Sequence, residues 1–527
     1  MVAPSPEPAK KPEPERRILS LPKRFRRNVS TGYLKTGSSA LITLVMTPVL
    51  ITGLGTEAFG IWIVIGSLAL YREILQFGFS TATPKYVAEY SALNDQERLR
   101  SSIATAFWML AIPGALALVL GLALAVVFPP VFHVSPDLEG QTQLLVVIVA
   151  IDFALAIPTD AFGGVLVGLQ RYDLLNTTLI VTNVAQAAAW AVVIVAGGGL
   201  VALGASTVAL SLLGQLWRYR LARRLVPGLS ISPRSVDREL IRPFTGLSVW
   251  YAVQNVATLV LNRIDTIVVG VVLGVAAAGV YAVGQKFTLA IAQVLTPVST
   301  VFFPHSSELS AQHDTAGLRQ SLLTGTRILL AVAAPFALTL AILAGPLIEA
   351  WVGPGFDGAI PVVIFLAGAV SIWAVSETGL VMLEGDGRIR VPALIRASEA
   401  VLNLGLSLTL AHLMGLKGVA LGTLLAAAAA NLLVFIPHMC RQFGLELRVF
   451  AGTVIAAHAP PAATALAVGW LVTRADPSTV PAIAAAAAVI MGAYLAVFAI
   501  TGLDRRERRM LIARLRGLRS RLYVSRA

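Results

Sequence analysis

Charged residues are scarce in this chain: Asp, Glu, Lys and Arg make up 13% of its 527 residues, whereas hydrophobic residues make up 56%. Soluble globular domains carry about a quarter charged residues, so the composition excludes an ordinary water-soluble enzyme or binding domain. Cysteine is scarcer still. Cys440 is the only one in the sequence, which excludes an internal disulfide and a cysteine-based metal site.

Catalytic motifs are also missing from the sequence. It contains no phosphate-binding glycine loop, no cluster of metal ligands and no nucleophile beside a base, and His305, His313 and His458 are isolated. No cleavable signal peptide is evident, because the first thirty residues are polar (PSPEPAKKPEPERR). Since the predicted outer loops are short, we expect a protein that is not an enzyme and needs neither a cofactor nor a metal.

Long apolar runs are what the sequence does contain, from about Tyr33 to Ile500. Such runs predict an all-α integral membrane protein. Division at Gly, Pro and charged residues gives about fourteen transmembrane helices. They lie near 33–54, 57–82, 102–128, 142–168, 173–196, 200–220, 245–273, 277–303, 322–347, 360–382, 392–413, 418–437, 452–473 and 480–501.

The distribution of Lys and Arg predicts the orientation. With a cytoplasmic N-terminus, 36 of the 41 basic residues fall at cytoplasmic ends, and the outer loops keep only Lys417 and Arg474. This asymmetry follows the positive-inside rule and predicts that both termini are cytoplasmic, in a bacterial plasma (inner) membrane. It also explains the net charge of +13 without nucleic acid. Arg72, Arg263 and Lys286 remain inside spans.

The sequence repeats itself at a shift of 219 residues. LGTEAFGIW at 54–62 aligns with LGVAAAGVY at 273–281, and loop residues such as Asp95 and Arg100 align with Asp314 and Arg319. Asn183 with Asn403, and VALG at 201–204 with 419–422, are each one residue out of register. Because the shift covers six spans, both copies have the same orientation, and the repeat is parallel.

The repeat predicts two six-helix lobes plus an extra C-terminal helix pair. The predicted segments are a disordered basic tail (1–30), an N-terminal lobe (31–222), a basic linker (223–242), a C-terminal lobe (243–440), the extra pair (441–501) and a basic amphipathic tail on anionic lipid (502–527).

Two charged residues, Arg263 and Asp265, interrupt the apolar stretch LVLNRIDTIVVGVVLG, and Lys286 interrupts the span that follows it. Arg263 lies 11 residues before Gly274 and Lys286 lies 12 residues after it, so both sit about 16–18 Å from the outer end. Asp265 is close by. Each such charge costs about 2.5–3.5 kcal/mol to insert. In one interpretation Arg263 and Asp265 neutralise each other, which leaves Lys286 without a partner; in the other, the cations form an anion-binding site.

Other polar residues in or near the spans are weaker candidates. Arg72 adds a further cation for an anion, and Lys35 lies at the inner end of the first span, where it either meets the anion or snorkels. Asp265, Glu73, Asp152 and Glu377 are possible coupling or pairing carboxylates, with Asp160 near them, and each is also open to a packing role. Tyr71, Tyr251 and Tyr281 could stack on sugars, or simply pack.

Three stretches resemble a known family. They are LGTEAFGIWIVIGSLALYREILQFGFSTATPKYVAEY, RIDTIVVGVVLGVAAAGVYAVGQKF and GRIRVPALIRASEAVLNLGLSLTLAHLMGLKGVALGT, within residues 31–440. They resemble the Wzx-type flippases of polysaccharides and lipid-linked oligosaccharides, in the multidrug/oligosaccharidyl-lipid/polysaccharide (MOP) exporter superfamily. Twelve helices are usual there, and fourteen resembles the peptidoglycan-precursor flippases and some polysaccharide transporters.

The resemblance implies transfer of an undecaprenyl-pyrophosphate-linked oligosaccharide to the outer leaflet by alternating access, with cavity cations holding the pyrophosphate. The positions here are Arg72, Arg263 and Lys286, with Lys35 at the entrance. It also implies membrane lipids and a polysaccharide polymerase with its chain-length machinery as partners. Two alternatives stay open: a multidrug extruder, which would favour an acidic cavity, and a membrane glycan polymerase or ligase, which would need larger outer loops.

Overall fold

The computed structural model describes residues 23–76, 79–240, 249–299, 302–503 and 508. Within these residues, fourteen helical segments are long and apolar enough to cross a membrane. The all-α fold and the fourteen spans predicted from the sequence are therefore confirmed.

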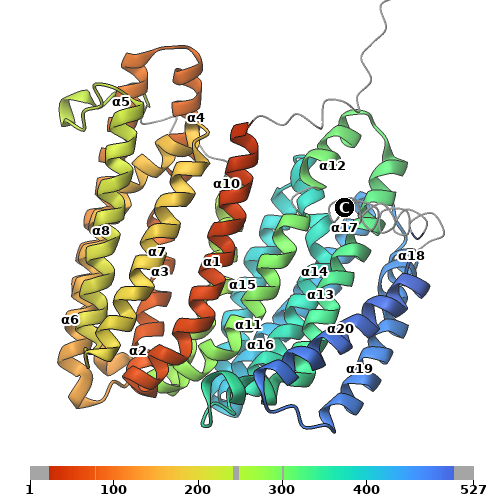
Figure 1. The fold of residues 1–527 in the computed structure, drawn as a ribbon. Helices are drawn as coiled ribbons and strands as arrows, with labels where there is room; N and C mark the ends of the chain where they lie inside the picture. Colours follow the sequence, from red (N-terminus) through yellow and green to blue (C-terminus); the bar gives the residue numbers. More distant parts are fainter. Residues whose placement is uncertain (1–22, 77–78, 241–248, 300–301, 504–507, 509–527) are drawn as a thin grey trace, which may run out of the picture.

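The N-terminal lobe occupies the left half of Figure 1. Its helices are α1 (Lys23–Leu54), α2 (Thr56–Ser67), α3 (Ala69–Leu75), α4 (Phe79–Ala92), α5 (Gln96–Val131), α6 (Pro136–Gly168), α7 (Tyr172–Val195) and α8 (Leu200–Leu225), followed by the short 3₁₀ turns η3 (Pro233–Ser235) and η4 (Arg238–Leu240).

The C-terminal lobe lies to the right. Its helices are α10 (Val249–Leu273), α11 (Val275–Ser299), α12 (Phe302–Ala311), α13 (Thr315–Val352), α14 (Ala359–Gly385), α15 (Arg390–Met414), α16 (Leu416–Ala427), the π-helix η5 (Ala428–Phe435) and α17 (Ile436–Gln442).

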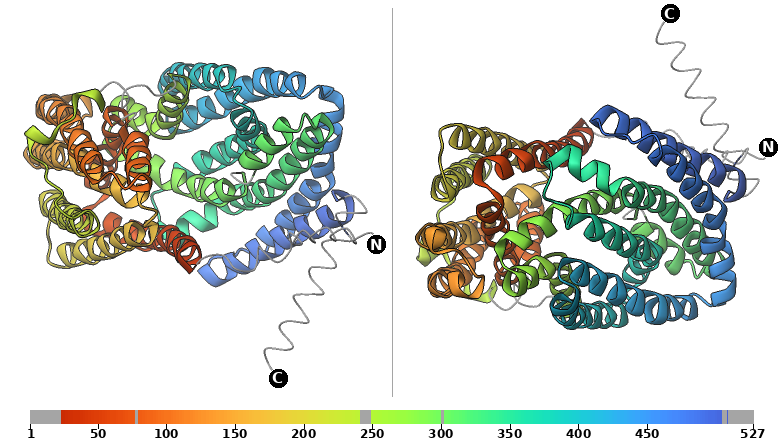
Figure 2. Two further views of the ribbon diagram at one scale, coloured as in Figure 1. Left: turned by 90° about the horizontal axis from the view of Figure 1, so that it is seen from above. Right: turned by 90° about the horizontal axis from the view of Figure 1, so that it is seen from below.

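The extra pair covers one edge of the C-terminal lobe, as the two end-on views of Figure 2 show. Its elements are α18 (Leu447–Phe450), the π-helix η6 (Ala451–Ile455), the 3₁₀ turn η7 (Ala456–His458), α19 (Ala459–Thr473) and α20 (Val480–Thr501). Its apolar residues pack on α13 around Ile490 and Tyr494. His458 fixes the junction, because its Nδ1 lies 2.7 Å from the Tyr494 hydroxyl.

The repeat is visible in backbone geometry as well as in sequence. Asp95 and Asp314 each cap a helix by accepting a hydrogen bond from the backbone N–H three residues on. The residue before each cap has a positive φ, 56° at Asn94 and 55° at His313. Two six-helix lobes related by a parallel repeat, with an additional helix pair, are thus confirmed.

The two lobes meet at one end of the bundle. We call the end where α1 begins the inner end and the end where it finishes the outer end; the inner end is at the top of Figure 1. A buried apolar cluster joins the lobes near the outer end, with Ile61 and Val64 of α2 beside Val269 of α10 and Val275 of α11. The backbones of the two lobes come into contact at Gly60, where an added Cβ would lie 1.8 Å from the Val275 carbonyl oxygen.

The structure differs from the predicted N-terminal tail (1–30) at the end of that segment. Residues 23–30 belong to α1, because Asn28 is bonded to the α6–α7 turn: its amide donates to the Gln170 carbonyl, and its side-chain oxygen accepts from the Asp173 N–H. Arg27 also pairs with Asp173 at 2.5 Å.

The predicted linker also differs in part from the structure. Its first residues continue α8 to Leu225, and its middle packs on α5, where Trp108 donates to the Ile231 carbonyl. Residues 1–22 and 241–248, and the terminal tail apart from 502–503 and 508, lie outside the described residues.

We predict that Gly60→Ala weakens the lobe contact, since its Cβ would meet backbone that must shift; a cost of about 1–3 kcal/mol is typical of overpacking. Gly66→Ala is the matched control, because Gly66 is also in α2 and has open space around its Cβ position. Heating the detergent-purified chain with a thiol-reactive dye measures exposure of the buried Cys440. Equal melting of Gly60→Ala and the wild type would contradict the prediction.

Candidate functional site

Asp265 of α10 is buried inside the C-terminal lobe and held by hydroxyl groups. Tyr281 donates to its Oδ2 at 2.8 Å and Thr423 at 2.6 Å. Ser407 donates to Oδ1 at 3.3 Å. Asn403 in turn donates to the Thr423 hydroxyl at 2.9 Å. Four neutral side chains from α11, α15 and α16 therefore support this carboxylate.

Arg263 is directed away from that network. Two residues along a helix turn the side chain by about 200°, so Arg263 and Asp265 lie on different faces of α10. Arg263 shares its face with Gly270, two turns on, where an added Cβ would meet Val64 and Phe132 of the N-terminal lobe. The side chain is partly exposed and forms no hydrogen bond or ion pair with another described residue. The interpretation in which Arg263 and Asp265 neutralise each other is wrong for this structure.

Lys286 of α11 also faces the N-terminal lobe. Its ammonium donates to the Thr47 hydroxyl of α1 at 2.6 Å and lies 5.5 Å from the centre of the Phe59 ring of α2. Thr47 and Phe59 are neutral, so the lysine has no ion pair among the described residues. Arg263 and Lys286 thus share the side of the C-terminal lobe that faces its partner lobe.

Arg72 lies elsewhere, within the N-terminal lobe. It pairs with Asp160 of α6 at 2.8 Å, and Gln76 donates to the same carboxylate at 2.6 Å. With Asp152 and Arg218 it lines a cavity of about 310 Å³ between α3, α6, α7 and α8. The structure therefore does not place Arg72 beside Arg263 and Lys286, although the sequence grouped the three as one cation set.

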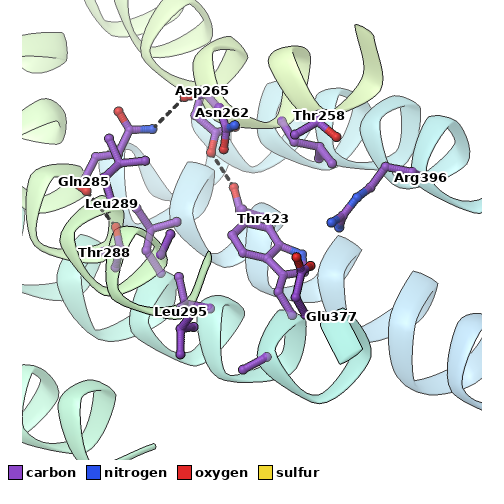
Figure 3. Close-up of a pocket in the computed structure, with 16 residues that line it drawn as sticks. Thr258, Asn262, Asp265, Gln285, Thr288, Leu289, Leu295, Glu377, Arg396 and Thr423 are labelled. Atoms are coloured by element: carbon purple, nitrogen blue, oxygen red, sulfur yellow. Dashed lines mark hydrogen bonds between the residues drawn. The ribbon is translucent and has the colours of Figure 1, made fainter. Parts of the chain in front are cut away.

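A second intralobe cavity, of about 240 Å³, lies in the C-terminal lobe (Figure 3). Asp265 lines one part of it, while Glu377 and Arg396 approach from α14 and α15. Arg396 is bonded to the buried Glu399 at 3.2 Å, and Trp373 donates to the other oxygen of Glu399 at 2.6 Å. The cavity therefore has acidic and basic groups in close proximity.

Sequence reasoning missed two of these arginines. Arg218 and Arg396 fall at the inner ends of the predicted spans 200–220 and 392–413 and were counted with the cytoplasmic charges. In the structure α8 continues to Leu225 and α15 begins at Arg390, so both arginines lie inside helices and reach the cavities. Their distance from the helix end, more than one turn in each case, is the signal that could have identified them.

The remaining candidates are scattered. Tyr281 has no exposed surface, and its hydroxyl is bonded to Asp265, so the prediction that it stacks on a sugar does not fit this structure. Tyr71 packs edge-on against Phe153 at 5.3 Å. The side chains of Lys35 and Glu73 are partly exposed and make no hydrogen bond within the described residues. Tyr251 has no described side chain.

Metal ligands do not cluster in the part of the chain that the structure describes: no group of three or more His, Cys, Asp or Glu side chains could hold a metal ion there. The polar chemistry of the described spans is that of hydrogen bonds, ion pairs and the cations between the lobes.

Comparison with solved structures shows the fold. A lipid II flippase MurJ in an inward closed conformation superimposes with a TM-score of 0.67, at 14% identity over 89% of this chain and 98% of that one. An inward-facing multidrug resistance MATE family transporter of the MOP superfamily gives 0.65, at 14% identity over 76% and 94%.

Sequence comparison shows the family. A family model described as polysaccharide biosynthesis protein matches residues 25–310, more than half of the chain. The uncharacterized membrane protein EpsK of Bacillus subtilis (strain 168) is 23% identical over 511 residues, which cover 93% of this chain and 97% of that protein.

The fold and these matches define a multi-pass membrane protein whose fold is that of MurJ- and MATE-type transporters. By sequence, this chain belongs to the polysaccharide biosynthesis protein family.

We predict that Thr423→Val destabilises the C-terminal lobe by about 1–3 kcal/mol, since Asp265 loses a donor and the Asn403 amide loses its acceptor in a buried site. Thr409→Val is the matched control: this exposed threonine on α15 bonds only to its own helix. The dye assay at Cys440 measures both variants. A lower melting temperature for Thr423→Val than for Thr409→Val supports the buried network. Equal melting temperatures count against it.

Proposed function

We propose that the protein is a flippase for a polyprenyl-pyrophosphate-linked oligosaccharide, which it moves from the cytoplasmic to the outer leaflet of the bacterial plasma membrane. The product serves the assembly of a cell-surface polysaccharide such as exopolysaccharide or the O-antigen of lipopolysaccharide. The family description and the fold support a cargo of this kind. The Lys and Arg distribution supports cytoplasmic termini, with the inner end of the bundle facing the cytoplasm.

The observation that carries this proposal is the position of Arg263 and Lys286 on the lobe-facing sides of α10 and α11. A pyrophosphate cannot cross hydrocarbon unaided, because an unpaired charge there costs several kcal/mol. Arginine grips phosphate oxygens with a planar fork and lysine adds a point charge. Two cations without an anionic partner among the described residues therefore suit an anionic headgroup.

Lys286 gives the transfer a first step. In this structure its ammonium is bonded to the neutral Thr47 hydroxyl. A phosphate oxygen is a stronger acceptor, since charge-assisted hydrogen bonds are about twice as strong as neutral ones. The arriving headgroup would replace Thr47 as the hydrogen-bond acceptor of Lys286. This exchange would remove a contact between the lobes.

Alternating access then follows from the outer cluster around Ile61 and Val269. While it is packed, the lobes are closed at the outer end; rocking the lobes apart there would open the other side. The lipid tail can stay in the bilayer throughout, and the extra pair α19–α20 is positioned along α13 to border its path. The headgroup leaves chemically unchanged, so we propose no enzymatic step; a polymerase and its chain-length machinery would act on the delivered product.

Removal of either cation tests the proposal. Arg263→Gln and Lys286→Gln are each expected to slow translocation of a lipid-linked oligosaccharide in proteoliposomes by tenfold or more, about the 1.5–3 kcal/mol of a hydrogen bond to a charged group. Lys286→Arg keeps the charge and is expected to retain most of the rate. Lys417→Gln, an exposed outer lysine, is the control.

Two outcomes of the translocation assay would contradict the proposal. Wild-type rates in both Gln variants would remove these cations from the cargo path. Transport of organic cations in place of the lipid-linked oligosaccharide would identify a drug extruder.

A further inference from the structure

A polar hollow of about 330 Å³ lies at the inner end of the C-terminal lobe, away from the lobe interface. It is bordered by the α12–α13 turn, the α14–α15 turn and the end of α17. Three arginines reach it from these separate elements, Arg319, Arg388 and Arg441, with Asp386 as the acidic residue among its lining side chains. The hollow thus carries a surplus of positive charge.

Asp386 does not neutralise Arg319 or Arg441, because its carboxylate is already paired with another residue. Arg388 pairs with it at 2.6 Å, the Ser310 hydroxyl donates to its other oxygen, and its side chain is only 9% exposed. One arginine and one carboxylate therefore neutralise each other. The charges of Arg319 and Arg441 remain.

Arg319 is held in place by the turn that follows α17. Its Nε donates to the Phe443 carbonyl at 2.8 Å. Its Nη2 passes so close to Gly444 that an added Cβ there would lie 2.4 Å away, and Gly444 has a φ of +62°. The Nη donors form no hydrogen bond within the described residues, and neither does the guanidinium of Arg441. A fixed fork loses little entropy when it binds an oxyanion.

The N-terminal lobe contains the matching hollow, of about 680 Å³, with a different charge balance. Arg100 is the repeat equivalent of Arg319 and packs on Gly228, as Arg319 packs on Gly444. There, however, acidic and basic residues are equal in number: Arg98, Arg100 and Arg234 with Asp95, Glu97 and Asp237. The fold alone therefore does not require the surplus in the C-terminal lobe.

We propose that the hollow formed by Arg319, Arg388 and Arg441 binds the phosphate group of an anionic membrane lipid. The spans that border it end at Gly385 and Gln442 and begin at Thr315 and Arg390, which places it at headgroup depth. Basic pockets between helix ends on the cytoplasmic side are suited to phosphate headgroups. The bound phosphate would join three turns of the C-terminal lobe, independently of the cargo between the lobes.

The test measures binding of a fluorescent short-chain phosphatidylglycerol to the detergent-purified full chain, with the phosphatidylcholine analogue as reference. Arg441→Gln removes a charge that makes no hydrogen bond within the described residues, so folding should be unaffected. It is expected to weaken binding about fivefold, as for one cation near a membrane surface. R319Q/R441Q should weaken it further. Arg100→Gln changes the N-terminal lobe's equivalent of Arg319 and should leave lipid binding unchanged.

Competition identifies the source of the phosphate. If pyrophosphate or inorganic phosphate binds with the same dependence on Arg319 and Arg441 while phosphatidylglycerol does not, the ligand is a soluble phosphate and the lipid assignment is overturned. Equal lipid affinity in the wild type and R319Q/R441Q would overturn the site itself. An equal loss in Arg100→Gln would show general attraction to a basic surface, and would also overturn it.

Discussion

Hydrocarbon offers no partner to a charge, and this constraint orders the polar groups of the whole molecule. Asp265 lies within a lobe and is supported by hydroxyls of Tyr281, Thr423 and Ser407. Arg72 is balanced by Asp160. Arg263 and Lys286, which lack such balance among the described residues, lie on the side of the C-terminal lobe that faces the other lobe. Arg319 and Arg441 lie at the inner end of the bundle.

The repeat supplies two nearly equivalent scaffolds, which differ in their polar side chains. The caps at Asp95 and Asp314 have the same geometry, and Arg100 and Arg319 pack on corresponding turns. Yet the N-terminal lobe holds its arginine–aspartate pair near α3, whereas the C-terminal lobe holds a carboxylate supported by hydroxyls. The duplicated backbone gives the two lobes the same helical scaffold, while different side chains give each lobe its own polar interior.

Hydropathy was sufficient for the fold, because a span must be apolar over a length set by the bilayer. The fourteen helices followed from that requirement, and the repeat followed from residue identities at a shift of 219, in loops as well as in spans. The site was harder to predict. Depth along α10 and α11 placed Arg263 and Lys286 at one level, but only packing revealed that Arg263 turns away from Asp265 and that Lys286 meets Thr47. Tyr281 was misjudged for the same reason, since sequence does not show which face a neighbouring helix covers.

The contact between Gly60 and the Val275 carbonyl brings two helix backbones together without a side chain between them. A barrier of this kind cannot be lifted by turning one rotamer. In the proposed transport cycle it would open only if one lobe moved as a whole, and the width of the passage would then equal the size of that movement. An exit of this kind would impose no tight size limit, so the proposed flippase would release sugar chains of different length or branching by the same route.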